Sequence, residues 1–186
     1  MDTALHHLHA TIIENVRAAL LEDVGSGDLT AQLVPLEARA RATVISREAA
    51  ILCGQDWFYE TFKQAAPSAT LDWHVAEGAV MGVNQTIVTI EGNARELLTA
   101  ERTALNFLQL LSGTATTVKQ YADALHGTKT KIVDSRKTIP GLRLAQKYAV
   151  TVGGGHNHRI ALYDGILIKE NYIATAGSVT KVLVNA

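Results

Sequence analysis

Five cationic side chains lie within a short stretch of the chain after residue 130, near predicted strand ends or in predicted loops. They are Arg136, Lys137, His158, Arg159 and Lys169. Proteins usually hold carboxylates and phosphates with arginine, which presents a rigid fork of donors, and with lysine, which presents a compact charge. The spacing of these residues therefore predicts a site for a small and strongly anionic ligand.

Arg136 and Lys137 follow a predicted strand at 131–134 and precede a Pro-Gly turn at 140–141. Most Arg-Lys pairs are solvated surface charges, and this is the simpler explanation. In α/β folds, however, ligands bind outside the carboxyl ends of the strands. We therefore interpret Ser135, Arg136 and Lys137 as one side of the anion site, because all three follow such a strand end.

Three glycines at 153–155 follow a predicted helix, so they are not the glycine fingerprint of a dinucleotide site, which follows a strand. Taken alone they indicate a flexible loop. Together with the Asn-His-Arg segment at 157–159, we interpret them as a place where the backbone approaches a ligand. His158 and Arg159 would then reach that ligand.

The composition is that of a globular protein, with 47% hydrophobic and 19% charged residues. Residues 1–130 carry nine Lys and Arg against fifteen Asp and Glu, whereas residues 131–186 carry eight against three. This basic segment favours an anion site. Nucleic acid is the competing explanation, but glycines and apolar runs interrupt the charges, and aromatic residues make up only 5%.

No run of the sequence is long and apolar enough for a membrane span, and the N-terminus lacks the pattern of a signal peptide. The single cysteine, Cys53, excludes an internal disulfide. These features predict a cytoplasmic protein with no membrane partner.

Hydrophobic spacing predicts an α+β module in the first part of the chain. The expected helices are 4–20, 55–64 and 94–126, and the expected strands are 41–47 with a continuation at 51–53, 70–76 and 86–91. We expect these strands to form an antiparallel sheet.

A different order begins at residue 131, where strands at 131–134 and 166–169 alternate with helices at 142–150 and from about 178. This order predicts parallel strands with helical crossovers. A closed eight-stranded barrel needs about 250 residues. We therefore expect the sheet to be completed by another chain, or the sequence to be part of a longer one.

Other charged residues have simpler explanations. Arg102 lies on the predicted long helix, where we interpret it as a surface arginine or as the ion-pair partner of Glu96 or Glu101. An acidic group near the end of the first helix indicates capping and turn chemistry more than a metal site. Its members are Glu22, Asp23 and Asp28.

Six ordered motifs resemble those of the quinolinate phosphoribosyltransferases, also called nicotinate-nucleotide pyrophosphorylases (carboxylating). They are LEDVGSGDLT at 21–30, ERTALN at 101–106, DSRKTIPGLR at 134–143, KYAV at 147–150, NHR at 157–159 and LIKEN at 167–171. The resemblance covers essentially the whole chain. It departs from the family pattern at Ser135, where threonine is usual, and at Tyr172, where histidine is usual.

The resemblance implies an N-terminal α+β domain with a long interdomain helix at 1–113, followed at 114–186 by the first part of an α/β barrel whose remainder is absent. It also implies a homodimer with sites shared between subunits. It implies transfer of phosphoribose from phosphoribosyl diphosphate to quinolinate with decarboxylation, giving nicotinate mononucleotide, diphosphate and CO2.

The resemblance also assigns roles to residues. Substrate would be bound by Arg102 of the neighbouring subunit and by Ser135, Arg136, Lys137, His158, Arg159 and Lys169. Lys137 and Lys169 would be catalytic, and Mg2+ would accompany phosphoribosyl diphosphate, held by acidic residues outside this sequence. Two alternatives stay open: an inactive fragment that only dimerises and binds an anion, and a molybdenum-associated paralogue group, which tends to lack the PGLR, NHR and KEN details.

Overall fold

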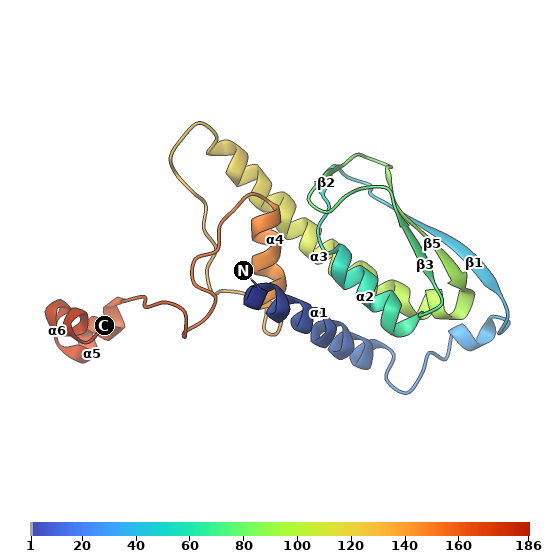
Figure 1. Ribbon diagram of the computed structural model, residues 1–186, viewed down its shortest axis with the longest axis horizontal. Helices are drawn as coiled ribbons and strands as arrows, with labels where there is room; N and C mark the ends of the chain where they lie inside the picture. The colour runs from blue at the N-terminus through green and yellow to red at the C-terminus, as the bar shows by residue number, and fades with distance from the viewer. Residues whose placement is uncertain (1) are drawn as a thin grey trace.

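The computed structural model describes residues 2–186, with side chains from residue 7 onward. A module of sheet and helices occupies one end of the molecule, and two short helices near the C-terminus stand apart at the other end (Figure 1). Within the described residues, no helix combines the length and the apolar character needed to cross a membrane.

The N-terminal module contains an antiparallel sheet of three strands in the order β1-β5-β3. These strands are β1 (Arg39–Ile45), β3 (Thr70–Trp73) and β5 (Thr86–Asn93). A separate antiparallel pair consists of β2 (Ala50–Ile51) and β4 (Val80–Met81). The predicted antiparallel α+β module is confirmed, although the strand predicted at 70–76 is shorter and β4 has no counterpart in the prediction.

Three helices pack within this module: α1 (Asp2–Asp23), α2 (Gln55–Ala65) and α3 (Ala94–Ala124). A single 3-10 turn, η1 (Ala31–Leu33), lies between α1 and β1. The N-terminus of α3 is capped by the Asn93 side chain, which accepts hydrogen bonds from the N–H groups of Arg95 and Glu96. From there α3 continues as one helix through residue 113, where the family resemblance implies that the first domain ends.

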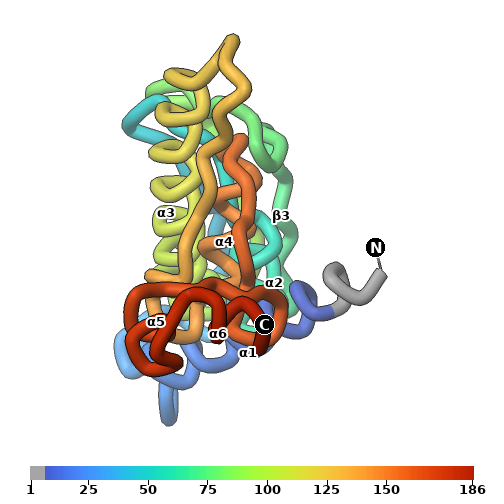
Figure 2. Tube along the Cα trace, turned by 90° about the vertical axis from the view of Figure 1, so that its left-hand side faces the viewer, coloured from blue at the N-terminus to red at the C-terminus, as the bar shows by residue number. Residues whose placement is uncertain are grey.

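Two apolar clusters hold the module together. The first fills the space between the sheet, α2 and the first half of α3, and it includes Phe58, Phe62, Val88, Ile90 and Leu97. The second joins α1, α2 and α3 to α4 (Arg143–Val152), and it includes Val16, Trp57, Leu111, Ala145 and Ala149. The second cluster therefore fixes α4 against the N-terminal module, and Figure 2 shows α3 and α4 next to each other.

The two strands predicted after residue 130 are largely wrong. At 131–134 the structure has only a single parallel bridge, between Val133 and His156, and at 166–169 the chain has no strand partner among the described residues. Parallel strands are normally covered on both faces by helices and paired with neighbouring strands. The described residues supply no further strand here, and Ile166 is accordingly 69% exposed.

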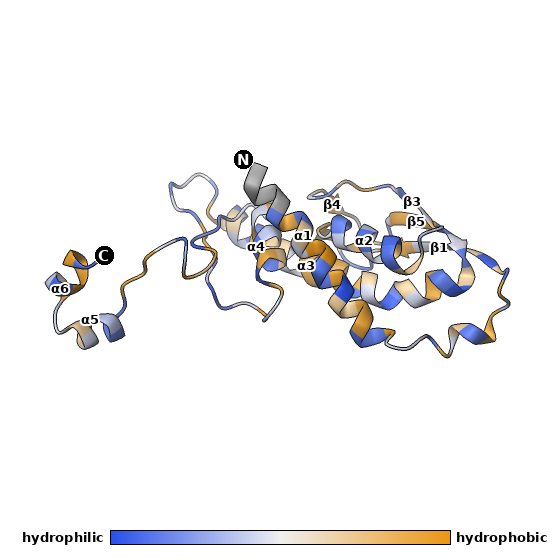
Figure 3. Cartoon of the chain, turned by 60° about the horizontal axis from the view of Figure 1, so that its bottom comes forward, coloured by the Kyte–Doolittle hydropathy of each residue, from blue (hydrophilic) through white to orange (hydrophobic). Residues whose placement is uncertain are grey.

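The chain ends in two short helices, α5 (Glu170–Ala176) and α6 (Val179–Val184), of which only α6 matches the prediction. They pack on each other and stand away from the other elements (Figures 1 and 3). Residues 162–186, which include these two helices, form an arm. Several large apolar side chains of this arm are exposed: Leu162, Tyr163, Ile166, Tyr172, Leu183 and Val184. The arm therefore resembles the beginning of a larger α/β layer, in agreement with the predicted incomplete barrel.

Candidate functional site

Asp134 is the centre around which the cationic segments are arranged. Its Oδ1 accepts from Nζ of Lys147 at 2.5 Å and from the backbone N–H of His158 at 3.0 Å. Its Oδ2 accepts from Nδ2 of Asn157 at 2.7 Å, and the same Nδ2 donates to the Lys147 carbonyl at 2.9 Å. One carboxylate thus joins α4 to the segment that carries His158.

Two stretches of chain run side by side at this point. The parallel bridge between Val133 and His156 is extended by hydrogen bonds from Asp134 N–H to the His156 carbonyl (3.1 Å) and from His156 N–H to the Ile132 carbonyl (3.0 Å). Because both stretches run in the same direction, residues 135–137 and 157–159 leave the bridge at the same end. The structure therefore brings most of the predicted anion-binding residues to one place.

Arg136 is partly buried, as Arg159 is, whereas Ser135 and Lys137 are exposed. The Nε atom of Arg136 is buried and has no hydrogen-bond partner. Lys137 donates its backbone N–H to the Ser135 hydroxyl at 3.2 Å, which tightens the turn. The Lys137 ammonium group forms no ion pair among the described residues.

Arg159 is held in place by the loop that follows it. One of its terminal nitrogens (NH1) donates to the Gly165 carbonyl at 2.9 Å. The loop is closed by Asp164, whose two oxygens accept from the N–H groups of Ile160 and Ala161, each at 2.7 Å. Those two N–H donors lower the pKa of Asp164 below its usual value of 3.8. The His158 side chain stays exposed beside Arg159.

The loop between Arg136 and α4 is also fixed at several points. Ile139 N–H donates to Oε1 of Gln146 at 2.8 Å, and Nε of Arg143 donates to the Thr138 hydroxyl at 3.2 Å. At the far end of the loop, Nδ2 of Asn15 on α1 donates to the Gly141 carbonyl at 3.1 Å. The Arg136-Lys137 turn is thus connected to both α4 and α1.

The glycines at 153–155 have a different role from the one predicted. A Cβ atom on Gly153 would lie 2.4 Å from the Ala115 carbonyl oxygen, and one on Gly155 would lie 2.9 Å from a methyl group of Val118. Both neighbours belong to α3. The glycines therefore allow the end of α4 to approach α3 closely, and Gly154 adopts the left-handed conformation at φ 88°.

Two predicted site residues are not brought to this cluster. Lys169 is exposed and lies directly before α5, in the arm that stands away from the other elements. Arg102 is exposed on α3 and forms no ion pair among the described residues, so of the two predicted alternatives the surface arginine is confirmed and the ion pair with Glu96 or Glu101 is not. Within one chain, neither residue completes the site.

Of the acidic residues near the end of α1, Asp28 serves a turn, as predicted, and Asp23 contacts α3. Asp28 accepts from Ala31 N–H at 2.9 Å and from the Thr99 hydroxyl at 3.0 Å, which lowers its pKa below the usual value. Asp23 accepts from the Thr103 hydroxyl at 3.3 Å. These bonds attach the segment after α1 to α3.

Sequence reasoning missed Lys147 and Asn157 as parts of the site. Lys147 is 2% exposed although it is a lysine in the middle of an amphipathic helix, where lysine normally faces solvent. Helical spacing gave no signal of this burial, because Lys147 is two residues away from both Ala145 and Ala149, which are fully buried on another side of α4. Its partner Asp134 is not on the same helix, so spacing alone gave no indication of the pair.

Two family models together match most of this chain. Family models described as the N-terminal and C-terminal domains of quinolinate phosphoribosyl transferase match residues 28–112 and 114–186. The chain belongs to the quinolinate phosphoribosyltransferase family. A probable nicotinate-nucleotide pyrophosphorylase (carboxylating) of Bacillus subtilis is 41% identical over 86% of this chain and 55% of its own length.

Solved structures of the family are also similar. The nicotinate-nucleotide pyrophosphorylase of Francisella tularensis is 46% identical, with a TM-score of 0.91, over 95% of this chain and 63% of its own. That of Ehrlichia chaffeensis is 39% identical, with a TM-score of 0.89, over 92% of this chain and 63% of its own. The chain thus spans between about half and two thirds of the length of these relatives.

Proposed function

We propose that this chain carries the quinolinate-binding part of an enzyme that transfers phosphoribose from phosphoribosyl diphosphate to quinolinate. The products would be nicotinate mononucleotide, diphosphate and CO2. Membership of the family supports the reaction, since relatives such as the Bacillus subtilis protein bear the name nicotinate-nucleotide pyrophosphorylase. We also propose a cytoplasmic location, supported by the single, buried and unpaired Cys53.

The observation that carries the proposal is the buried Nε of Arg136, which has no acceptor in the protein. Buried donors in folded proteins are almost always paired, because an unpaired one costs about 1–3 kcal/mol and more when charged. An anionic ligand beside Arg136 would supply the acceptor. Lys137, His158 and Arg159 leave the same end of the bridge, so further cationic or donor groups are available to that ligand.

Quinolinate has two adjacent carboxylates on a pyridine ring, and it matches a site with several cations. Arginine can hold each carboxylate through two hydrogen bonds, which would orient the ring nitrogen. That nitrogen attacks the anomeric carbon of the donor as the bond to diphosphate breaks. Loss of CO2 then leaves its bonding electrons in the cationic ring, and a proton takes its place. The protein contributes mainly orientation and electrostatic stabilisation.

Mg2+ would neutralise the diphosphate of the donor, but the carboxylates near the cluster do not fit a metal site. Asp134 is bound by Lys147, Asn157 and the His158 N–H, and both oxygens of Asp164 accept backbone N–H groups. Among the described residues, no group of three or more potential ligands is close enough to hold a metal ion. We therefore assign no residue of this chain to Mg2+ and expect the ion to arrive with phosphoribosyl diphosphate.

We further propose that the site is shared between the two subunits of a homodimer. Arg102 is exposed on α3 and takes no part in the Asp134 cluster of its own chain. This leaves its guanidinium available to the site of a second subunit. Lys169, in the exposed arm, would join the cluster once the arm is packed in a complete α/β layer.

Calorimetric titration of the chain with quinolinate tests the binding step, with nicotinate, which lacks one carboxylate, as the matched control. We expect quinolinate to bind at least about tenfold more tightly, equivalent to about 1.4 kcal/mol. Equal affinity for both ligands would contradict the proposed site. Release of diphosphate that requires both substrates tests the reaction. Quinolinate binding without such release, after addition of Mg2+ and in a full-length version that completes the α/β layer, would favour an anion-binding module.

A further inference from the structure

The side-chain amide of Asn15, in the middle of α1, joins two parts of the chain that are distant in sequence. Its Oδ1 accepts from the indole Nε1 of Trp57 on α2 at 3.3 Å, and its Nδ2 donates to the Gly141 carbonyl at 3.1 Å. Asn15 is partly buried, whereas Trp57 is completely buried. The amide therefore lies between the core of the N-terminal module and the loop between Arg136 and α4.

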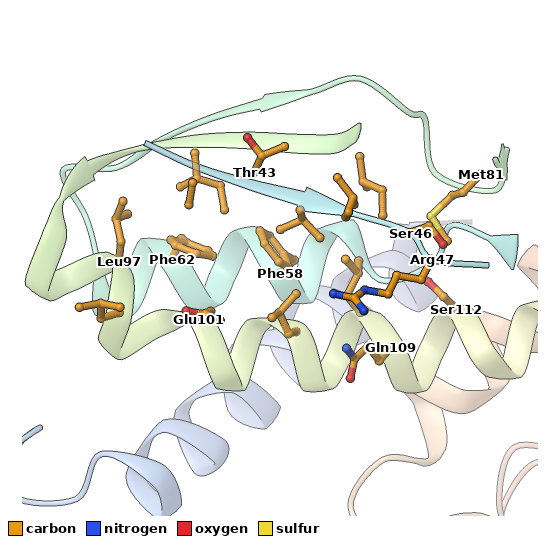
Figure 4. A pocket seen from close by; sticks show the side chains of 18 of the residues that line it. Thr43, Ser46, Arg47, Phe58, Phe62, Met81, Leu97, Glu101, Gln109 and Ser112 are labelled. Carbon is orange, nitrogen blue, oxygen red and sulfur yellow. The ribbon is translucent and has the colours of Figure 1, made fainter. Parts of the chain in front are cut away.

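The position of Trp57 on α2 explains why its indole meets α1. Phe58 and Phe62, on a neighbouring face of α2, line the groove between β1 and α3 (Figure 4). Consecutive residues of a helix point about 100° apart, so Trp57 is directed to another side. It belongs to the apolar cluster that α2 shares with α1, α3 and α4. Its indole N–H is thus buried beside α1, where it needs an acceptor.

The indole fixes which way round the Asn15 amide lies. An indole nitrogen can only donate a hydrogen bond, so the amide must present its oxygen to Trp57. The opposite orientation would set the amide NH2 group against the buried indole N–H and leave donors unpaired. The NH2 group is therefore directed at the Gly141 carbonyl, which accepts no other hydrogen bond among the described residues.

The Gly141 carbonyl has a defined direction because it belongs to a tight turn. Leu142 N–H donates to the Ile139 carbonyl at 3.1 Å, and Gly141 has φ 79°. A proline followed by a residue of positive φ is the pattern of a type II turn, and Pro140 occupies the first of these positions. The side chains of α4 hold this loop from one side, and Asn15 holds it from the N-terminal module.

We propose that Asn15 is a positioning residue for the loop that carries Arg136. Thr138 N–H donates to the Arg136 carbonyl at 3.0 Å, so the Arg136 end and the Gly141 end belong to one hydrogen-bonded loop. The buried Nε of Arg136 meets a carboxylate only if this loop keeps its place, because hydrogen bonds weaken steeply with misalignment. The inference rests on the proposed binding of quinolinate at Arg136.

Asn15→Asp tests this role with almost no change in size. A carboxylate still accepts from the Trp57 indole, but it has no donor for the Gly141 carbonyl and repels it. Calorimetric titration should therefore show quinolinate binding that is weaker by about tenfold. Arg17→Ala is the matched control, because it changes the net charge by the same amount at an exposed position of α1. Its affinity should stay within about twofold of the unaltered chain, since exposed charges are screened.

Two NMR measurements separate a positioning role from a purely structural one. Without ligand, Asn15→Asp should accelerate hydrogen exchange of the Ile139 N–H by about fivefold or more, because the loop opens locally. Quinolinate should shift the indole N–H resonance of Trp57 in the unaltered chain and in Arg17→Ala, but not in Asn15→Asp. The second tryptophan of the chain, Trp73, packs against the first apolar cluster and is the internal reference.

The proposal is overturned if Asn15→Asp leaves either the quinolinate affinity or the exchange of Ile139 unchanged, even if urea unfolding shows a loss of stability. If the unaltered chain itself does not bind quinolinate, the proposed function fails, and the exchange of Ile139 alone decides whether Asn15 positions the loop. Asn15→Ala removes the same donor without burying a charge, and it replaces Asn15→Asp if that variant does not fold. It should show both effects, and the absence of either contradicts the proposal.

Discussion

The ammonium group of Lys147 and the carboxylate of Asp134 form an almost completely buried ion pair, with 2.5 Å between Nζ and Oδ1. Only 3% of the Lys147 side chain and 8% of the Asp134 side chain are exposed. The pair is satisfied by additional hydrogen bonds from Asn157 and from the His158 N–H. It therefore connects α4 to both of the segments that carry the anion-binding cations.

Replacing one member of this pair should be costly. Lys147→Met leaves the Asp134 carboxylate buried without its counter-charge, and we expect a loss of about 3–5 kcal/mol in the free energy of unfolding. Lys119→Met is the matched control, because it removes an exposed ion pair with Asp123 on α3 and should cost only about 0.3–0.5 kcal/mol. Urea unfolding followed by circular dichroism measures both values. Similar losses in the two variants would show that the buried pair adds little.

The contact between α3 and the end of α4 should be equally sensitive to a single methyl group. Gly153→Ala forces a Cβ to within 2.4 Å of the Ala115 carbonyl oxygen, so the helices must move apart, at a cost of about 1–3 kcal/mol or more. Gly113→Ala is the control, since a Cβ there meets nothing within 4 Å inside α3. It should stabilise the helix by about 0.5–1 kcal/mol. Thermal unfolding of the two variants should therefore shift in opposite directions.

Local patterns in the sequence predict those features that depend on neighbouring residues. The alternation around Arg41 to Val44 gives β1, and the helical spacing of apolar residues gives α1, α2 and α3. The grouping of Arg136, Lys137, His158 and Arg159 also follows from the sequence, because all four residues follow expected strand ends or loops.

Features that depend on distant partners are not predictable in this way. Lys147 is buried only because Asp134 lies opposite it, and the close approach of Gly153 to α3 depends on Ala115. The strand predicted at 166–169 requires neighbouring strands that the described residues do not provide, so its apolar run remains unpaired. Intrinsic preference for β structure is weak without such neighbours.

A second polar link between α4 and the N-terminal module should be visible in an alkaline titration. The Tyr148 hydroxyl donates to Oε1 of Glu77 at 3.0 Å, and burial together with the charge of Glu77 raises the pKa of Tyr148 above its usual value of 10.0. The neutral phenol therefore stabilises the fold below pH 10, and this contribution is lost as the pH rises through the folded-state pKa. In an ultraviolet titration, Tyr148→Phe should remove a phenol that ionises later than free tyrosine. If the late ionisation of tyrosine were the same in Tyr148→Phe and in the unaltered chain, the raised pKa would not belong to Tyr148.

Acidic pH should open the loop that holds Arg159. The pKa of Asp164 is lowered because the carboxylate accepts from the N–H groups of Ala161 and Ile160, so its contribution is complete above pH 3.8 and is lost as the pH falls through the folded-state pKa. Asp164→Ala should accelerate hydrogen exchange of these two amides at neutral pH. In the unaltered chain the two N–H groups should stay protected below the usual carboxyl pKa of 3.8, because the folded-state pKa is lower. Equal exchange in both proteins would show that the turn forms without Asp164.

The anion site itself should depend on Arg136 far more than on total charge. Because Arg136 is partly buried and its Nε has no protein partner, Arg136→Ala should weaken quinolinate binding by about 2–5 kcal/mol in calorimetric titrations. Arg136→Lys keeps the charge but removes the donor fork, so it should recover only part of this loss. Arg17→Ala removes an exposed cation of α1 and is the control for net charge. If Arg17→Ala and Arg136→Ala lower the affinity equally, quinolinate is attracted by the overall charge of the chain and the Arg136 site is not the one that binds it.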